Sequence, residues 1–362
     1  PVVQVLGDPP LVNPTLAELA DQFGFPTDVT ATLFDLAIVG AGPAGLGAAV
    51  YGASEGLSTL VIEQEAVGGQ AGTSSMIRNY LGFPRGLSGR RLTTLSLEQA
   101  TRFGVAFHLM RSVTTVRATG EGFRMALSNG TEVSTRAVLL ACGVSYRRLG
   151  VATVERLLGA GVFYGAATGE AQAVEGLPAY VVGAGNSAGQ AALHLARYAA
   201  AVTMVVRGAD LESTMSDYLI RELRAHERIT VRTRAEVVDG GGDGHLEWIT
   251  LRDNDTGDRV RTAAAGLFIL IGAEPRTDWL PEQIERDVRG YVRTGAAIAV
   301  ERWPLDRPPM AFETSLPGVF AAGDVRAGSV KRVAAAAGEG AVAVPMIHSV
   351  LSGQATSSVL PR

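Results

Sequence analysis

Two glycine-rich turns constrain what this chain can fold into more than any other feature of its sequence. The first turn, residues 40–45, reads Gly-Ala-Gly-Pro-Ala-Gly, and the second turn, residues 183–188, reads Gly-Ala-Gly-Asn-Ser-Ala. Each turn follows an apolar run and precedes a small-residue segment of helical length, after which another apolar run begins. A strand, a glycine-rich turn, a helix and a second strand form a βαβ unit, so the sequence predicts two such units.

The glycines of such a turn have separate physical tasks that point to a bound phosphate. In the first turn, Gly40 allows the chain to reverse tightly, Gly42 lets the backbone approach a pyrophosphate, and Gly45 lets the helix pack on the strand. The phosphates would lie at a helix N-terminus, where unpaired N–H groups favour negative charge. Both turns are therefore predicted to bind dinucleotides.

The predicted fold class is α/β, with two Rossmann-like dinucleotide-binding domains of three layers each (β/β/α). A length of 362 residues fits about two domains. Apolar runs that end at Gly143 and Gly272 are expected to close the two sheets, and the run before Gly323-Asp324 is expected to return to the first sheet. The second domain is therefore expected to be inserted into the first.

The predicted domain boundaries follow from these strands. Residues 31–150 and 274–362 are expected to form the first domain, and residues 151–273 the second. Residues 1–30 combine a short extended run, a Gly/Pro turn and a helical pattern of Leu and Ala. They are expected to form an N-terminal arm, or to be the remnant of an upstream glutaredoxin-like module.

Composition excludes several classes of function. Hydrophobic residues make up 47% of the chain and charged residues 19%, which argues against disorder, and a net charge of −4 without a basic run argues against nucleic acid as a partner. No signal-like start and no uninterrupted apolar run of about 18 residues is found, so we expect a cytoplasmic protein without membrane contact. The five histidines show no ligand-like spacing, so no metal site is expected.

Two acidic residues stand at the ends of predicted strands, where they could bind sugar hydroxyls. Glu63 lies 18 residues after Gly45, and a carboxylate at that place accepts hydrogen bonds from a ribose while repelling a 2′-phosphate. The first turn is therefore expected to bind FAD or NAD and not NADP. Asp324 could lie beside a ribityl hydroxyl, or could instead cap the helix that follows.

The ordered motifs resemble those of the low-molecular-weight thioredoxin reductase family over about residues 33–352. In that family, two Rossmann-like domains bind FAD and NADPH in a homodimer, and electrons pass from NADPH to FAD, to a Cys-x-x-Cys pair and then to thioredoxin. The motifs that carry the resemblance are the two turns, Gly68-Gly69-Gln70, Ala141-Cys142-Gly143, and the segment from Thr314 to Asp324 that ends in Gly-Val-Phe-Ala-Ala-Gly-Asp.

The resemblance assigns cofactor-binding roles residue by residue. It implies an FAD site formed by Gly40, Gly42, Pro43, Ala44, Gly45, Glu63, Gln64, Gly69, Gln70, Asn79, Val113, Ala141, Gly143, Gly323, Asp324, Lys331, Arg332 and Val333. Among these, Glu63 would bind the adenosine ribose, Val113 would meet the adenine, and Asp324 would bind the ribityl chain. The implied NAD(P)H site consists of Gly183, Gly185, Asn186, Ser187, Ala188, Arg207, Ile271 and Gly272.

The chain departs from the family at the redox-active pair. Gly165 and Thr168 occupy the two cysteine positions, and neither can form a thiolate or a disulfide, so no catalytic residue is predicted there. Cys142 is the one cysteine of the chain and is expected to be a buried, small apolar residue.

The chain also departs from the family at the NADP-binding cluster and through an insertion. Arg207 is the one arginine left of the cluster, while Asp210 and Glu212 would oppose a 2′-phosphate, so NADPH is favoured only slightly over NADH. The insertion, residues 300–311, could be a lid or a partner surface, although such a segment is more often a rigid surface loop.

The sequence thus predicts an FAD-dependent NAD(P)H oxidoreductase, expected to be a homodimer, that reduces an acceptor outside this chain. That acceptor could be a protein, an upstream domain, another flavin, a quinone or oxygen. The alternatives are a non-enzymatic FAD/NAD(P) redox sensor or structural module, and a ferredoxin- or flavodoxin-NADP reductase. The last is disfavoured because residues 351–362 contain no aromatic residue to stack on a flavin.

Overall fold

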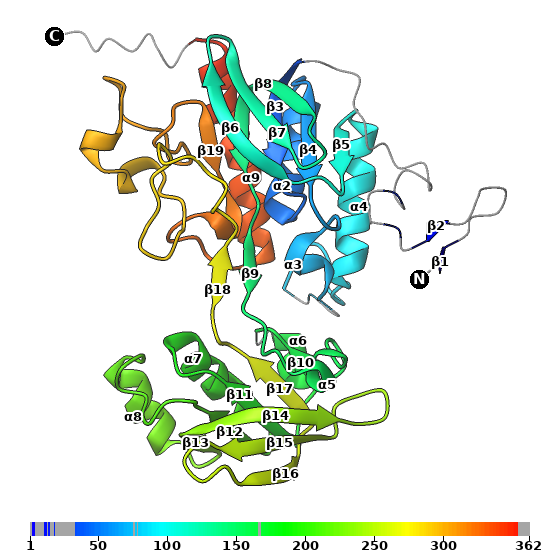
Figure 1. Ribbon diagram of the computed structural model, residues 1–362, viewed down its shortest axis with the longest axis vertical. Coiled ribbons are helices and arrows are strands. Elements are labelled where there is room, and N and C mark those ends of the chain that lie inside the picture. The colour runs from blue at the N-terminus through cyan, green and yellow to red at the C-terminus, as the bar shows by residue number, and fades with distance from the viewer. Residues whose placement is uncertain are drawn as a thin grey trace.

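The structure is a computed structural model that describes residues 2–3, 11–12, 14, 18, 33–74, 77, 79–165 and 168–353. Two lobes are joined by a pair of antiparallel strands, β9 (Val144–Tyr146) and β18 (Ala273–Pro275), which run between them in Figure 1. Near the N-terminus, β1 (Val2–Val3) pairs with β2 (Leu11–Val12), and the helix expected after them lies outside the described residues.

The first lobe is built on a parallel sheet whose central strand is β3. In this sheet Ile38 of β3 lies between Val61 of β4 and Leu139 of β8. The first half of β8 pairs in the antiparallel sense with β7 (Gly122–Leu127), which pairs with β6 (Val113–Thr119). The parallel strands, in sheet order, are β5 (Ala106–Leu109), β4 (Thr59–Glu63), β3 (Leu33–Val39), β8 (Glu132–Leu140) and β19 (Val319–Ala321).

Alternating residues of β3 face two different layers, as expected for a strand buried on both sides. Leu36 and Ile38 pack against helices, whereas Ala37 and Val39 pack in a second core cluster with residues of β6 and β7. The helical layer contains α2 (Pro43–Ser54), α4 (Gly89–Arg102) and α9 (Val333–Leu351), and the short helix α3 (Gly69–Gly72) adjoins α4.

The second lobe repeats this plan with residues 151–272. Val181 packs on the helical face of a parallel sheet, and Val182 packs on the face covered by an antiparallel meander. The sheet order is β10 (Val162–Phe163), β17 (Gly266–Ile269), β11 (Pro178–Val182), β12 (Ala201–Val205) and β13 (Ile229–Arg232). The other elements are α5 (Ala152–Glu155), α6 (Thr168–Gln172), α7 (Asn186–Leu195), α8 (Asp217–Ala225), and the meander β14 (Ala235–Gly241), β15 (Trp248–Asp253) and β16 (Arg259–Ala263).

The predicted α/β class, with two parallel sheets, is therefore confirmed. The first sheet takes its strands from residues 33–140 and 319–321, on both sides of the residues that form the second sheet. Three short 3₁₀ helices lie in the returning segment, at Gly295–Ala297, Val300–Arg302 and Gly323–Val325.

Helix α9, which follows the Asp324 segment, is long and apolar. Its 19 residues have a mean hydropathy of 1.3, so by length and composition alone this helix, and no other in the described part of the chain, could cross a membrane. In the structure it packs on α2 through glycines, because a Cβ on Gly340 would lie 2.0 Å from the Ala44 carbonyl oxygen. Arg136 donates to the Leu351 carbonyl at 2.8 Å at the end of the helix. The helix belongs to the core of the first lobe.

Candidate cofactor site

The first turn has the backbone that the sequence predicts for a phosphate-binding turn. Gly40 has φ +108°, and a Cβ there would lie 2.4 Å from the Ala141 carbonyl oxygen. A Cβ on Gly45 would lie 1.9 Å from the Gly40 carbonyl oxygen, whereas a Cβ on Gly42 would meet no atom within 4 Å. Two glycines therefore allow strand, turn and helix to pack, and the third leaves open space beside the backbone.

The open space at Gly42 lies at the N-terminus of α2, a helix of 12 residues. Gly42 is the N-cap residue and no side chain caps the helix, while Pro43 takes a position where an N–H is not needed. The first-turn N–H groups and the helix dipole therefore remain available for an anion. This arrangement fits the pyrophosphate of a dinucleotide.

Glu63 binds the first turn directly. Its side chain is 7% exposed, with Oε2 accepting the Ala41 N–H at 2.7 Å and Oε1 accepting the Glu65 N–H at 2.9 Å. Burial raises the pKa of the Glu63 carboxyl, and the two N–H donors act in the opposite direction. Each oxygen has a further lone pair for a hydroxyl group. Glu63 thus holds the turn as well as offering acceptors, a second role that the sequence did not predict.

Two other predicted segments meet the first turn. The Gly68 N–H donates to the Ala41 carbonyl at 2.8 Å, and a Cβ on Gly69 would lie 3.3 Å from the Gly42 Cα. On the other side, a Cβ on Gly323 would lie 2.8 Å from the Ala44 Cβ. The fold therefore brings residues near 42, 69 and 323 to one place, although they are far apart in the sequence.

The backbone around Asp324 is fixed by residues that the sequence analysis did not single out. The Gly323 N–H donates to Glu339 at 2.7 Å, and Glu339 pairs with Arg326 at 2.8 Å. Lys331 Nζ donates to the Asp324 carbonyl at 2.6 Å, so this lysine also braces the segment. No hydrogen bond to the Asp324 carboxylate itself is found within the described residues, and burial raises its pKa. The carboxylate thus fits a ligand hydroxyl better than a helix cap.

The remaining predicted FAD residues differ in how they can contribute. Val113, on β6, is buried in the core cluster that contains Ala37 and Val39, so that only its backbone could meet an adenine. Asn79 is exposed, and Val333, which begins α9, packs on the cluster that contains Tyr80 and Phe83. Gln64 and Gln70 are exposed, and Ala141 is buried. Gly143 has φ +63°, and Arg332 is the residue that directly precedes helix α9.

Arg111 is a candidate cofactor residue that the sequence analysis missed. Its N–H donates to the Glu63 carbonyl at 3.1 Å, and its side chain is 7% exposed. The Nε atom has no hydrogen-bond partner among the described residues, which is costly for a buried cation. Its position beside Glu63 fits a donor to the adenosine half of a dinucleotide. No local sequence pattern identifies such a residue, because the burial arises from the tertiary fold.

The second turn repeats the geometry of the first. Gly183 has φ +142°, and a Cβ on it would lie 2.4 Å from the Leu270 carbonyl oxygen, whereas a Cβ on Gly185 would meet nothing within 4 Å. Gly185 is the N-cap of α7, again without a side-chain cap. Ile271 packs on the meander-side core, and Gly272 has φ +106°. The second turn therefore also offers an uncapped helix N-terminus.

A loop is held over this second turn by polar side chains. The Asn186 side chain accepts the Ser216 N–H at 2.8 Å and donates to its hydroxyl at 3.0 Å, and Thr214 donates to the Ala184 carbonyl at 2.8 Å. Asn186 therefore positions the loop, a role distinct from the direct nucleotide contact that the resemblance implies. Ser187 is exposed, and Ala188, which is part of α7, is buried in the core of the second lobe.

The charges on this loop differ from the sequence-based expectation. Glu212 pairs with Arg224 at 2.7 Å, which lowers the pKa of the glutamate and directs its charge to α8. Arg207 is exposed and has no ion-pair partner within the described residues. The expected opposition between Glu212 and a phosphate is therefore weakened, and Arg207 remains a cation at the end of β12.

The place of the missing cysteine pair contains no thiol. Gly165 has φ +123°, and a Cβ on it would meet no described atom within 4 Å, while Thr168 begins α6. Cys142 as a whole residue is half-buried, which corrects the expectation of a buried residue in part, and its Sγ donates to the Arg276 carbonyl at 3.3 Å. Burial of the thiol itself raises the pKa of Cys142 to about 12, so the thiolate is not formed near neutral pH.

Two other features lie outside the predicted cofactor residues. Arg307 forms a two-point ion pair with fully buried Glu313, at 2.7 and 2.8 Å, which favours a fixed surface loop over a lid for residues 300–311.

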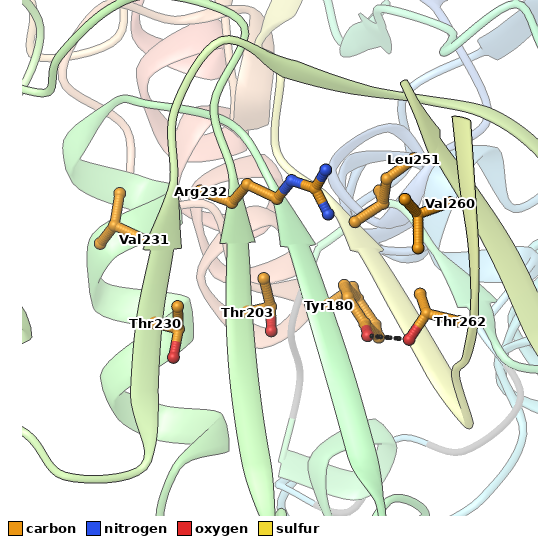
Figure 2. Close-up of a pocket in the computed structure, with 8 residues that line it drawn as sticks. All are labelled: Tyr180, Thr203, Thr230, Val231, Arg232, Leu251, Val260 and Thr262. Atoms are coloured by element: carbon orange, nitrogen blue, oxygen red, sulfur yellow. Dashed lines mark hydrogen bonds between the residues drawn. The ribbon is translucent and has the colours of Figure 1, made fainter. Parts of the chain in front are cut away.

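A groove of about 350 Å³ lies between the second sheet and its meander, as Figure 2 shows. Its lining contains none of the predicted site residues, so the glycine turns define the candidate site. No cluster of metal-ligating side chains occurs in the described residues.

The chain has two parallel sheets, and in each a glycine-rich turn leads into a helix whose N-terminus has no side-chain cap. This arrangement defines a protein of the two-dinucleotide-fold class. The model of the pyridine nucleotide-disulphide oxidoreductase family matches residues 34–340. The chain belongs to this family, and within it to the low-molecular-weight thioredoxin reductases, of which it is a member without a Cys-x-x-Cys motif. The family binds FAD and NAD(P)H.

Individual relatives agree with this assignment. The chain is 35% identical to a thioredoxin reductase of Mycolicibacterium smegmatis, covering 86% of this chain and 94% of that protein. It is 32% identical to a bifunctional thioredoxin reductase/thioredoxin of Mycobacterium leprae, covering 86% of this chain and 64% of that protein. The crystal structure of thioredoxin reductase from Streptococcus pyogenes superposes with a TM-score of 0.78 at 28% identity, covering 89% of this chain and 99% of that chain.

Proposed function

We propose that the chain is an FAD-dependent NAD(P)H oxidoreductase that passes electrons to an acceptor outside itself. The main support is a contrast between two parts of the chain. Both helix N-termini lack a side-chain cap and begin at a glycine with open space beside it, whereas the place of the cysteine pair holds Gly165 and contains no thiol. These features support two dinucleotide sites in a chain that has no internal dithiol.

In this proposal the first domain, residues 31–150 and 274–362, binds FAD, and residues 151–273 form an inserted domain that binds NAD(P)H. Glu63 binds the adenosine ribose of FAD, Arg111 donates to the adenosine half, and the Asp324 carboxylate binds the ribityl chain. Arg207 pairs with a nucleotide phosphate. The flavin supplies the hydride chemistry when bound, and the protein supplies position and electrostatics.

The assembly and cellular setting extend the same proposal. We expect a cytoplasmic homodimer, since thioredoxin reductases are typically homodimers. One relative combines a thioredoxin reductase and a thioredoxin in its name, and this supports a thioredoxin-type protein domain as an electron acceptor here. The absence of the cysteine pair equally supports a second candidate function, a redox sensor that binds both nucleotides without turnover.

Anaerobic mixing of the FAD-loaded protein with NADPH or NADH separates these functions. The oxidoreductase proposal expects the visible band of oxidised flavin to bleach within the time of one turnover, about a second or less for an ordinary enzyme. Flavin that stays oxidised while the nucleotide binds, as measured by calorimetry, would support the sensor instead. A protein that takes up no FAD on reconstitution would contradict both.

A further inference from the structure

A group of three tyrosines lies where the two lobes join. Tyr146 ends β9, and its ring stacks on that of Tyr164 with centroids 6.2 Å apart and planes inclined by 25°. Tyr291, from the returning segment, donates to the Ala273 carbonyl at 3.3 Å, and Ala273 pairs with Tyr146 across β9 and β18. Tyrosines from three separate parts of the sequence therefore lie around the crossover.

Contacts connect this group to the proposed flavin site. Lys331 Nζ lies 4.5 Å from the centroid of the Tyr291 ring and donates to the Asp324 carbonyl at 2.6 Å. Asp324 adjoins Gly323, which packs on Ala44 of the first turn. Burial raises the pKa of Tyr146 most strongly, and the nearby charges of Asp324 and Glu170 raise it further, which agrees with a buried position close to both carboxylates.

The Tyr164 ring is held rigidly. Its hydroxyl donates to Glu155 and accepts the Leu149 N–H at 2.8 Å. Arg148 pairs with Glu155 at 3.1 Å and places its guanidinium 5.2 Å from the centroid of the ring. Fixing a ring in this way lowers the entropy that is lost when another ring stacks on the group.

Open space adjoins the backbone directly after the rigid ring. Gly165 follows Tyr164, and among the described residues no atom lies within 4 Å of a Cβ placed on it. Its φ of +123° favours glycine, so the backbone itself keeps a side chain out of this space. In addition, no pair of thiols is available to exchange with a disulfide, since Cys142 is the one cysteine of the chain and burial raises its pKa to about 12.

We propose that the crossover binds the electron acceptor, and that this acceptor is a planar aromatic molecule of the quinone class that stacks on Tyr146. The inference rests on the proposed function, which supplies the reduced flavin. Aromatic platforms favour flat ligands, and a quinone needs no thiol to accept two electrons. Lys331, the one lysine of the chain, places a positive charge beside the Tyr291 ring of the same group, where it would favour the negative charge that develops on the quinone oxygens.

The electron balance closes without a covalent bond to the protein. NAD(P)H supplies a hydride, which carries two electrons and one proton, by way of the flavin, and solvent supplies the second proton. NAD(P)H, a proton and the quinone thus become NAD(P)⁺ and the hydroquinone. The nicotinamide is oxidised and the quinone is reduced.

The test uses the full-length, FAD-loaded protein with 1,4-naphthoquinone as the probe under anaerobic conditions. The variants are Tyr146→Leu and Tyr146→Phe, and the control is Tyr218→Leu, which removes a tyrosine that is 51% exposed on α8. The proposal expects Tyr146→Leu to raise the KM for the quinone about tenfold, from the loss of ring stacking. The Phe variant and the control should stay within about twofold of wild type, the usual range of a neutral substitution.

A binding measurement without turnover accompanies the kinetics. Titrating the oxidised protein with 1,4-naphthoquinone should perturb the flavin spectrum in wild type and in Tyr146→Phe, and more weakly in Tyr146→Leu. FAD content and circular dichroism of each variant identify any loss of folding, in which case the wild-type titration and Tyr146→Phe carry the test.

The outcomes separate this inference from the proposed function. If NAD(P)H bleaches the flavin but the quinone does not reoxidise it, the acceptor class is wrong and the proposed function stands. If the quinone is reduced with the same KM in Tyr146→Leu and wild type, the placement of the site is wrong. If NAD(P)H never bleaches the flavin, the proposed function itself fails.

Discussion

Placing a side chain on Gly165 should destabilise the protein through the backbone alone. Its φ is +123°, a conformation that costs a residue with a Cβ about 1–3 kcal/mol, and no described atom lies within 4 Å of the added Cβ, so no clash with the described residues adds to this cost. Gly165→Ala should therefore lower the free energy of unfolding by about 1–3 kcal/mol relative to a matched glycine substitution elsewhere. Restoring a cysteine at this position would meet the same penalty.

Gly120 provides the matched control. A Cβ on Gly120 also meets no atom within 4 Å, but its φ is not positive. Replacing either glycine by alanine reduces the entropy of the unfolded chain by a similar amount, so the difference between the two variants isolates the conformational cost. Equilibrium unfolding in urea, with unchanged m-values, measures that difference.

A difference below about 0.5 kcal/mol, the scatter of ordinary surface substitutions, would refute this reasoning. It would mean that the backbone at Gly165 is not held in a glycine-specific conformation. The chain could then accept a cysteine there at no cost, and the double change Gly165→Cys with Thr168→Cys would be expected to form a disulfide. On the present account that double variant is destabilised and gives no robust turnover with thioredoxin.

Three further predictions concern single groups. Because burial raises the pKa of Glu63, acidification should start to lower the affinity for FAD at a higher pH than it would for an ordinary glutamate. Glu63→Gln should bind FAD more weakly and without this pH dependence. A pH-independent Kd in wild type would contradict the prediction. Cys142, with its pKa raised to about 12, should react with iodoacetamide at pH 8 far more slowly in the native than in the urea-unfolded protein, and equal rates would count against it. Arg207→Ala should weaken NADPH about tenfold and NADH little, by calorimetry, and equal losses would remove its phosphate role.

The fold could be predicted from the sequence where local chemistry determines it. The two glycine patterns each stand between apolar runs, and their tasks divide in the structure as predicted, with Gly40 and Gly45 packed and Gly42 open. Helix α9 shows the limit of local reasoning, because a helix was expected after Asp324 but its extent from Val333 to Leu351 follows only from the structure. Pro345 removes one backbone donor inside this helix, but packing on α2 holds the helix together.

The candidate site was less predictable because its contacts are long-range. The Glu63 carboxylate binds the Ala41 N–H from 22 residues away, and Asn186 holds Ser216 from 30 residues away. The buried Nε of Arg111 is recognisable only once the fold places it beside Glu63. The sequence therefore indicated candidate residues, whereas their hydrogen-bond partners became evident only from the tertiary structure.

Counting the electrons that the FAD-loaded protein accepts tests the central claim most directly. An oxidoreductase with an internal dithiol takes up two electrons in the flavin and two more in the disulfide, whereas this chain has one cysteine and can form no internal disulfide. Anaerobic titration with NADPH, followed through the visible flavin band and checked with dithionite, should reach its end point at one two-electron equivalent per FAD. An end point at two equivalents, or a flavin that NADPH and NADH both leave oxidised, would contradict the account.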